Sequence, residues 1–508
     1  MRKNILIVFI GLISLSACKK DFLEQENPNA SNIAQYYTSQ NDVLLAVNGA
    51  YASLRSGDNI GENSGLYTDQ RSDDTGTNDN QSNAGEPFQF GDFSISPSNA
   101  YLKNHWGSLY QTISRCNIIT SNIDNVPFTN PEIKIQYLGE TKFLRALMYF
   151  QLVRKWGDVP LVTKQLNSTA EVTENTYRQP QTAVYAQIVS DLKDALTSTL
   201  IPNLATGANA GRVSKAAING LLGQVYLTMA TTLDAGKTEN LANANTYLTA
   251  AYNLKPFASL TAVPYADVFD VTKKNSNPEI IFEIVNIQGN ASYASSIAAN
   301  NQAWGETINS KKAATNVGGN VTPDLVLDYE TRDPRKDFSI KYAADTRVLD
   351  WFVTKYRDVS DNAGVNGYGG NNCPIMRYAD IILMLAEVNM LQGNDAAAIN
   401  YLDMVRARAG VPLYAVARTN ATYNAKYPTL KLAILHERRV ELAFEHHRWF
   451  DLLRFFTTAE LVTFFKAKSQ ANFGNARLSN FTTKDRYFPI PFDEYKLNPE
   501  KMYQNPGY

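Results

Sequence analysis

The sequence predicts a mostly α-helical protein in which tetratricopeptide-like helical hairpins support a loop-rich, irregular region with a few short strands. Many stretches carry apolar residues three and four positions apart, which is the spacing of one helix face. Short connections join neighbouring helical stretches, and equivalent positions recur at roughly 30–40 residues, as in tetratricopeptide repeats. Two long polar stretches, about 57–99 and 256–372, lack this period and contain many aromatic residues.

The charge balance argues against a nucleic-acid partner. The 508 residues include 48 Lys and Arg against 49 Asp and Glu, and no basic cluster interrupts this balance. Such a surface produces no field that would attract a polyanion. The three cysteines, Cys18, Cys116 and Cys373, do not form a disulfide framework.

The first residues predict export and a lipid anchor. Arg2 and Lys3 precede a short apolar run over 5–15, which is too short to span a bilayer. The tetrapeptide Leu-Ser-Ala-Cys then ends at Cys18 and is typical of a bacterial lipobox, whose cysteine becomes the lipidated mature N-terminus. We therefore expect a signal peptide at 1–17 and a lipidated tether at 18–34. The alternative is an ordinary secretory signal followed by a chance cysteine.

The helical stretches follow one another with short connections. Pro131 is suited to the first turn of its helix, and the small residues Gly220 and Gly223 would let a neighbouring helix approach closely. Helical repeats are therefore expected over about 100–255 and 375–456. The expected helices are 38–55, 101–122, 131–153, 179–196, 215–230, 240–253, 379–391 and 396–409.

The two irregular stretches are expected to be ordered loops. Loops of this length inside a compact protein are usually functional or disordered, and their aromatic content argues against disorder. Within the second stretch, 279–284 reads as a short buried strand. The glycine-rich segment 364–372 has no phosphate-loop spacing and is expected to be a turn.

Residues 429–456 predict one long helix, because the segment contains neither Gly nor Pro. Glu437, Glu441 and Glu445 fall four apart on one face of it. Paired carboxylates can perform acid/base hydrolysis, as in glycosidases, or can form a structural network with arginines. We favour the network, because a nearby guanidinium lowers the pKa of each acid.

The partners expected for these glutamates are local. Arg438 and Arg448 lie three positions from a glutamate, and further arginines, Arg406 and Arg408, are on the preceding helical segment. A zinc site is not expected, because the second histidine of an H-E-x-x-H motif is replaced by Val440.

Several ordered motifs resemble one family along the whole chain. They are Cys-Lys-Lys-Asp-Phe-Leu-Glu from Cys18, FLRALMYFQLVRKWGDVP at 143–160, ER-x-x-ELAFE-x-x-RWFDLLR at 437–454 and YFPIP at 487–491. In these motifs the chain is similar to the SusD/RagB family, surface lipoproteins of Bacteroidetes that bind nutrients for an outer-membrane transporter.

The resemblance implies one SusD-like domain over 35–508 whose irregular loops bind the ligand, and a protein that is not an enzyme. It implies capture of a glycan, an oligosaccharide or polysaccharide, and delivery to a SusC-like TonB-dependent transporter. The chain would be lipid-anchored and surface-exposed on the cell outer membrane, and it would need no cofactor. Bound calcium is possible but is not indicated by the sequence.

Candidate ligand contacts follow from what neutral sugars require, which is flat aromatic faces beside polar groups on loops held by a rigid scaffold. Trp106, Trp156 and Trp449 lie in helical or family-wide motifs and are expected in the core. Trp304 lies in a polar loop and is the first candidate. Trp351 is the second candidate, with a buried strand residue as the alternative.

The remaining candidates lie in other loops. Tyr293 belongs to the same polar loop as Trp304. A second cluster combines an aromatic ring with charged groups, with a solvated loop or a calcium site as the alternatives, although its spacing is not that of an EF-hand. Its members are Tyr67, Asp69, Arg71, Asp73 and Asp74.

No nucleophile-elbow, zinc, phosphate-loop or dinucleotide motif is present. Three alternatives to glycan capture remain at this stage. They are a RagB-like peptide import subunit, a surface glycoside hydrolase, and a scaffold whose repeats bind protein alone.

Overall fold

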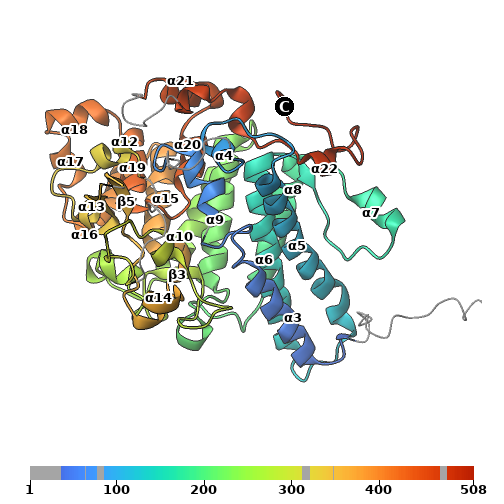
Figure 1. Ribbon diagram of the computed structural model, residues 1–508. Helices are drawn as coiled ribbons and strands as arrows, with labels where there is room; N and C mark the ends of the chain where they lie inside the picture. The colour runs from blue at the N-terminus through green and yellow to red at the C-terminus, as the bar shows by residue number, and fades with distance from the viewer. Residues whose placement is uncertain (1–35, 63, 77–84, 312–320, 347, 469–476) are drawn as a thin grey trace, which may run out of the picture.

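The computed structural model describes residues 36–62, 64–76, 85–311, 321–346, 348–468 and 477–508. These residues form a mostly helical protein with short two-stranded sheets, as predicted. In Figure 1 the long helices α3, α5, α6, α8 and α9 run side by side, and the other half of the molecule combines further helices, among them α10, α15 and α16, with short helices, strands and loops. The predicted signal peptide and tether lie outside the described residues.

The predicted long helices are present, with ends defined by side-chain caps. Ser39, Asn99 and Asn130 each accept a hydrogen bond from a first-turn backbone N–H, and Pro131 occupies the first turn of its helix. The helices are α3 (Gln40–Ser53), α5 (Ala100–Asn122), α6 (Pro131–Trp156), α8 (Gln181–Ala195), α9 (Lys215–Thr232), α10 (Lys237–Asn253), α15 (Tyr378–Leu391) and α16 (Asp395–Ala409).

Neighbouring helices pack as hairpins. Helix α9 packs along α10, α15 packs along α16, and α10 also contacts α15, so the two hairpins stack on each other. The expected close approach at the glycines is confirmed, because a Cβ added at Gly223 would lie 2.4 Å from Leu248 Cγ in α10. At Gly220 the added Cβ would lie 2.4 Å from Met376 Sδ.

The strands pair in antiparallel twos. The strand expected at 279–284 is β3 (Ile280–Ile284), which pairs with β6 (Cys373–Arg377). A hairpin of β4 (Ile340–Ala343) and β5 (Asp350–Val353) was not expected from the sequence. The third pair joins β1 (Val159–Pro160) to β2 (Arg178–Gln179).

Short helices occupy much of the irregular region and the C-terminal third. One of them is α14, so the first residues of the glycine-rich segment 364–372, which was expected to be a turn, belong to a short helix. The short helices are α4 (Phe88–Gly91), α7 (Thr169–Asn175), α11 (Ile297–Asn300), α12 (Pro323–Asp328), α13 (Pro334–Ser339), α14 (Asp361–Asn366), α17 (Tyr414–Ala417), α18 (Ala421–Lys426), α21 (Thr458–Lys466) and α22 (Phe492–Tyr495).

The prediction of one unbroken helix over 429–456 is wrong. The segment forms α19 (Leu430–Glu441) and α20 (Arg448–Phe455), and the turn between them holds Phe444 and His446 at φ 65° and 67°. We call residues 442–447 the α19–α20 turn.

Buried donors explain this break. Lys355 Nζ donates to the backbone oxygen of Ala443 at 2.8 Å, and Arg377 Nη2 donates to that of Glu441 at 2.8 Å. The Tyr356 hydroxyl donates to the backbone oxygen of Phe444 at 3.0 Å. The bond to Glu441 satisfies a carbonyl group that helix α19 leaves unpaired at its C-terminus, and the other two satisfy carbonyl groups of the turn. The two cations lie at the negative end of the helix. Phe444 and His446 adopt the left-handed backbone conformation in a turn that these tertiary contacts hold, and the local sequence does not reveal such contacts.

The tryptophans assigned to the core are buried: Trp106, Trp156 and Trp449 expose 3 % or less of their surface. Cys116 and Cys373 are free thiols and are also buried. No helix in the described part of the chain combines the length and apolar composition needed to cross a bilayer.

Candidate functional site

The five side chains of the Tyr67 cluster are buried inside the protein. The ring of Tyr67 stacks on that of His105 with a centroid distance of 3.8 Å. Asp69 lies 3.0 Å from Nδ1 of His446. The Arg71 guanidinium is fully buried among the rings of Phe93, Trp449 and Phe488 and donates to the backbone oxygen of Asp485 at 2.6 Å.

The two aspartates of this cluster are buried ion-pair partners. Arg448 donates to Asp73 at 2.7 and 2.9 Å, and Arg439 Nε donates to Asp74 at 2.7 Å. Burial raises the pKa of Asp73, but the charges of Arg439, Arg448 and Lys468 outweigh this and hold it well below its ordinary value. Burial raises the pKa of Asp74 to about 7. All five side chains are buried and bonded within the protein, an arrangement that favours a structural role over the predicted contact with a ligand.

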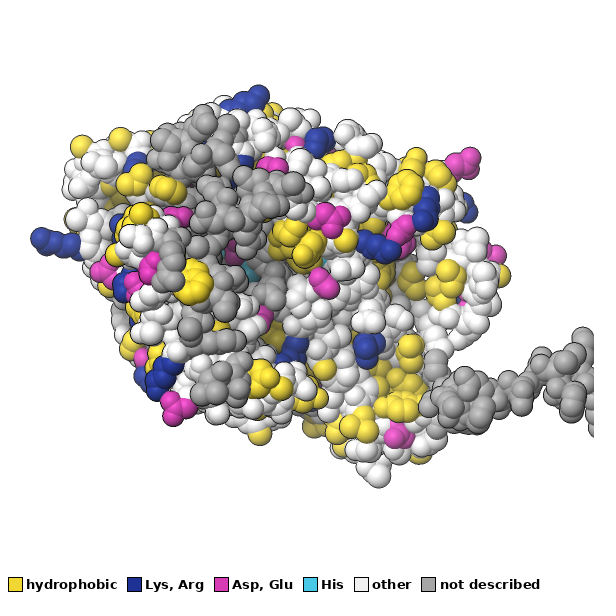
Figure 2. Space-filling model, viewed as in Figure 1, with side chains coloured by type: hydrophobic (Ala, Val, Ile, Leu, Met, Phe, Trp, Pro, Cys, Tyr) yellow, Lys and Arg dark blue, Asp and Glu magenta, His cyan; other side chains and the backbone are white. Residues whose placement is uncertain are grey.

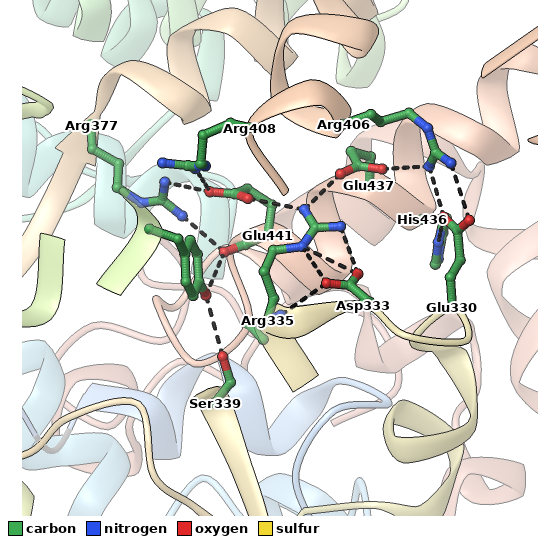
Figure 3. Close-up of polar contacts among 12 residues, drawn as sticks. Glu330, Asp333, Arg335, Ser339, Arg377, Arg406, Arg408, His436, Glu437 and Glu441 are labelled. Carbon is green, nitrogen blue, oxygen red and sulfur yellow. Dashed lines mark hydrogen bonds and ion pairs between the residues drawn. The ribbon is translucent and has the colours of Figure 1, made fainter. Parts of the chain in front are cut away.

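The three glutamates of α19 and its turn belong to a larger ion-pair network, shown in part in Figure 3. Arg335 lies between two of them, with Nη1 2.6 Å from Glu437 and 3.0 Å from Glu441, and its Nη2 lies 2.8 Å from Asp333. Arg406 bonds the other oxygen of Glu437 at 2.8 Å. These side chains come from α13, α16 and α19, so the network fastens the irregular region to the helices.

The rest of the network surrounds the α19–α20 turn. Arg377 Nη1 lies 2.6 Å from Glu441, its Nε lies 2.7 Å from Glu445, and Lys355 Nζ lies 2.6 Å from Glu445. Arg408 also pairs with Glu441. The two arginines of α16 that were predicted as partners of these glutamates, Arg406 and Arg408, do pair with them.

The predicted local partners are wrong. Arg438 binds Asp380 and Asp451 at 2.8 and 2.9 Å, and Arg448 binds Asp73. Neither arginine therefore serves the glutamate three positions away. The general-acid alternative needs an acid with a raised pKa in a cleft. Glu445 is fully buried, and although burial raises its pKa, Arg377 and Lys355 lower it to about 2. The structural network is therefore the interpretation that the geometry favours.

A further candidate, Tyr293, lies in an open groove. Two adjoining hollows of about 440 and 320 Å³ share Arg55, Ala52 and Ile284 as well as Tyr293 itself, and we call them together the Tyr293 groove. Pockets of this size suit small ligands. The groove lies between the end of α3, the loop at 208–212 and the segment after β3.

The Tyr293 ring is 46 % exposed, and the Arg55 guanidinium lies 4.9 Å from its centroid. The loop that carries the ring is closed by its own backbone, because Ile287 N–H donates to the Tyr293 carbonyl at 2.6 Å. An aromatic face beside a cation on a fixed loop is suited to stacking against the C–H face of a sugar ring while the guanidinium reaches a hydroxyl.

Polar groups line the rest of the groove. Glu62 accepts hydrogen bonds from the Ser295 and Ser296 side chains, and Arg212 donates to Asn48 at 3.0 Å. Burial raises the pKa of Glu283 to about 7, although Asn372 and Lys274 oppose the shift. The groove therefore offers both donors and acceptors, which is what hydroxyl groups require.

Trp351 and Trp304 lie elsewhere, on and beside the β4–β5 hairpin. Trp351 is a half-buried strand residue, packed edge-on against the exposed ring of Tyr342 at 5.6 Å, and Lys336 Nζ lies 5.5 Å from its ring. Trp304 is half-buried in the loop after α11. The loop contacts the hairpin, because Ala303 packs on Ala343 and Phe352. Tyr293 therefore lies in the Tyr293 groove, whereas Trp351 and Trp304 lie at the β4–β5 hairpin. The sequence did not single out Arg55, which lies beside Tyr293, or Tyr342, which lies beside Trp351.

On the face shown in Figure 2, basic and acidic side chains are interspersed among hydrophobic ones, and the surface is hollowed near its centre. No broad basic patch is visible there, which agrees with the charge balance of the sequence. Among the described residues, no group of three or more His, Cys, Asp or Glu side chains is arranged to hold a metal ion.

Comparison with known proteins defines the class. The model of the SusD family matches residues 347–508, and a second model, described as starch-binding associating with outer membrane, matches residues 21–227. Together with full-length relatives, these matches show that the chain belongs to the SusD/RagB family. The prediction of a binding protein and not an enzyme is confirmed by this membership.

Relatives of known name match most of the chain. SusD-like protein P2 of Formosa agariphila is 24% identical over 100% of both chains. SusD-like protein P38 of the same organism is 26% identical over 89% of this chain and 91% of its own. A SusD-like protein of Bacteroides ovatus is 20% identical over 100% of this chain and 92% of its own.

Solved structures share the fold. A laminarin-binding SusD-like protein superposes with a TM-score of 0.70 and 26% identity, covering 93% of this chain and 100% of its own. Surface glycan-binding protein A from Bacteroides thetaiotaomicron, solved with laminarihexaose, gives a TM-score of 0.74 at 20% identity, covering 92% of this chain and 100% of its own.

Proposed function

We propose that the protein is a surface-exposed, lipid-anchored subunit that captures a glycan and delivers it to a SusC-like TonB-dependent outer-membrane transporter. The observation that carries the proposal is the Tyr293 groove, where a half-exposed aromatic ring lies beside Arg55 among hydrogen-bonding groups. The laminarin-binding relative supports a neutral glucan as the first ligand to test.

Delivery to a transporter follows from proximity. A capture site held next to a pore raises the effective concentration of glycan there, and this gain needs no new contact between ligand and transporter. The lipid at Cys18 would keep the subunit at the membrane, with residues 18–34 as its tether. The ion-pair network supports the same role, because it fixes the loops against the helices.

A binding screen tests the proposal. The protein beginning at Lys19 is titrated with laminarin oligosaccharides, other neutral glycans and peptides, followed by tryptophan fluorescence and by analysis of products. We expect saturable binding of a glycan with no cleavage. Binding of peptides alone would indicate a RagB-like import subunit, cleavage products would indicate an enzyme, and no binding to any ligand would favour a protein scaffold.

A further inference from the structure

A second cavity, separate from the Tyr293 groove, lies between α6, α9 and the α19–α20 turn. Its volume is about 50 Å³, and we call it the Arg154 cavity. Helix α6 contributes Gln151, Arg154 and Lys155, and α9 contributes Gln224 from the other side. A cavity needs roughly 10–15 Å³ to hold one water molecule, so this one has room for a few non-hydrogen atoms.

Arg154 has no carboxylate partner in the cavity. Among the described residues, none places a carboxylate oxygen within 4.0 Å of its guanidinium. The guanidinium lies instead between the rings of Phe150 and Phe450, 3.9 and 3.6 Å from their centroids, and its Nε donates to the Phe150 backbone oxygen at 3.1 Å. Burial lowers the pKa of Arg154 to about 9, so the group still carries its charge at neutral pH.

The acid that lines the cavity does not balance this charge. Glu445 is the one carboxylate among the described lining residues, and it is bonded to Lys355 at 2.6 Å and to Arg377 at 2.7 Å. Arg377 also pairs with Glu279 and Glu441, so Glu445 belongs to a shared ion-pair network and is not a partner of Arg154. Among the described groups that line the cavity, the charge of Arg154 is therefore the one without an ion-pair partner.

Lys155 is the second basic group of the cavity wall. Its Nζ lies 2.8 Å from Nε2 of His105, whose Nδ1 lies 2.7 Å from the backbone oxygen of Asp58. A carbonyl oxygen only accepts, so Nδ1 of His105 carries its proton and Nε2 accepts from Lys155. His105 is therefore neutral and supplies no negative charge. Burial, with Arg154 adding to it, lowers the pKa of Lys155 well below its ordinary value.

The two glutamine amides are available to a ligand. No hydrogen bond joins the side-chain amide of Gln151 or Gln224 to another described residue. Both amides can donate N–H groups into the cavity. Asp451 and Asp380 act on Arg154 only from beyond ion-pair distance. A guanidinium without an ion-pair partner beside two amide donors is suited to an anion, because a desolvated unpaired charge is unfavourable.

We propose that the Arg154 cavity binds one small monovalent anion, a halide or a carboxylate group, which pairs with Arg154 and stabilises the ammonium form of Lys155. The bound anion would connect α6 to the α19–α20 turn and so support the centre of the fold. The proposal does not rest on glycan binding, because the Tyr293 groove contains neither cation.

Thermal unfolding tests it. The protein is melted in rising concentrations of sodium formate or sodium chloride, with sodium gluconate keeping the ionic strength constant, since gluconate is too large for the cavity. We expect a saturable rise in Tm with formate, chloride or both, and the more effective salt identifies the anion. Arg154→Gln is expected to weaken the apparent affinity at least tenfold, whereas Arg418→Gln, which removes an exposed arginine, leaves it unchanged.

Gln224→Met provides a second variant if Arg154→Gln does not fold, because it keeps both cations and removes one donor. We expect it to weaken the affinity several-fold. The proposal is overturned if neither salt gives a saturable rise in Tm of the unmodified protein. It is also overturned if Arg154→Gln binds the anion as tightly as the unmodified protein does. If Arg154→Gln does not fold, the same result with Gln224→Met overturns it. A glycan titration of the same variants separates this result from failure of the Tyr293 groove.

Discussion

Glu441→Gln is expected to lower the free energy of unfolding by roughly 3–5 kcal/mol, the loss typical of removing one partner from a buried ion pair. Glu441 is fully buried, and its carboxylate bonds Arg377 at 2.6 Å, Arg335 at 3.0 Å and also Arg408. The amide keeps the shape of the side chain but not its charge, so three buried guanidinium groups lose a shared anion. Equilibrium unfolding in urea at neutral pH measures the difference.

The sign of the pH dependence follows from the direction of the pKa shift. Burial alone would raise the pKa of Glu441, but Arg408, Arg377 and Arg335 lower it below its ordinary value. The ion pairs therefore stabilise the fold fully above the ordinary glutamate pKa, and this contribution is lost as the pH falls toward the lower folded value. The difference between the unmodified protein and the variant should shrink in acid.

Asp493→Asn is the matched control. Asp493 pairs with Lys103 and Lys496 at the surface, where ion pairs contribute little. We expect its loss of stability to be much smaller than that of Glu441→Gln. Equal losses in the two variants would contradict the role given to the network.

Cys18→Ala is expected to release the protein from the membrane almost completely. The predicted lipobox would place the acyl chains on this cysteine, and each buried methylene contributes about 0.8 kcal/mol to membrane binding. No helix of the described residues offers a second attachment by spanning the bilayer. Cell fractionation with protease treatment of intact cells shows where the variant lies, and we expect it in the periplasmic soluble fraction.

Ser16→Ala, which keeps a small residue before the cysteine, is the control and is expected to remain at the membrane. If Cys18→Ala still reaches the surface in membrane-bound form, the lipobox interpretation is wrong.

Helix positions could be predicted from the sequence because their determinants are local. The stripe of α5, the Asn130 cap with Pro131 and the small residues of α9 all act within a few residues. The family could be recognised from the same helical motifs. The end of α19 could not be predicted, since Lys355 and Arg377, which bind its last carbonyl groups, lie more than 60 residues away.

The candidate site was harder to predict for a related reason. Asp73 and Asp74 appear in a polar loop and look exposed, but Arg439 and Arg448, some 365 and 375 positions later, bury them. Arg55 ends a helix and looks ordinary until the fold brings it to Tyr293. An aromatic ring in a polar loop was the signal that made Tyr293 a candidate, and this signal did not show which side chains surround the ring.

Calorimetric titration of the Tyr293→Ala variant with the glycan selected by the screen tests the central claim most directly. The ring supplies the stacking face of the groove, so we expect binding to weaken by roughly 1–3 kcal/mol, the range for an aromatic anchor, with no change in Tm. Tyr101→Ala removes a tyrosine of similar exposure, 39 %, on helix α5 and should bind as the unmodified protein does. Unchanged affinity in Tyr293→Ala would contradict the claim that the Tyr293 groove captures the glycan.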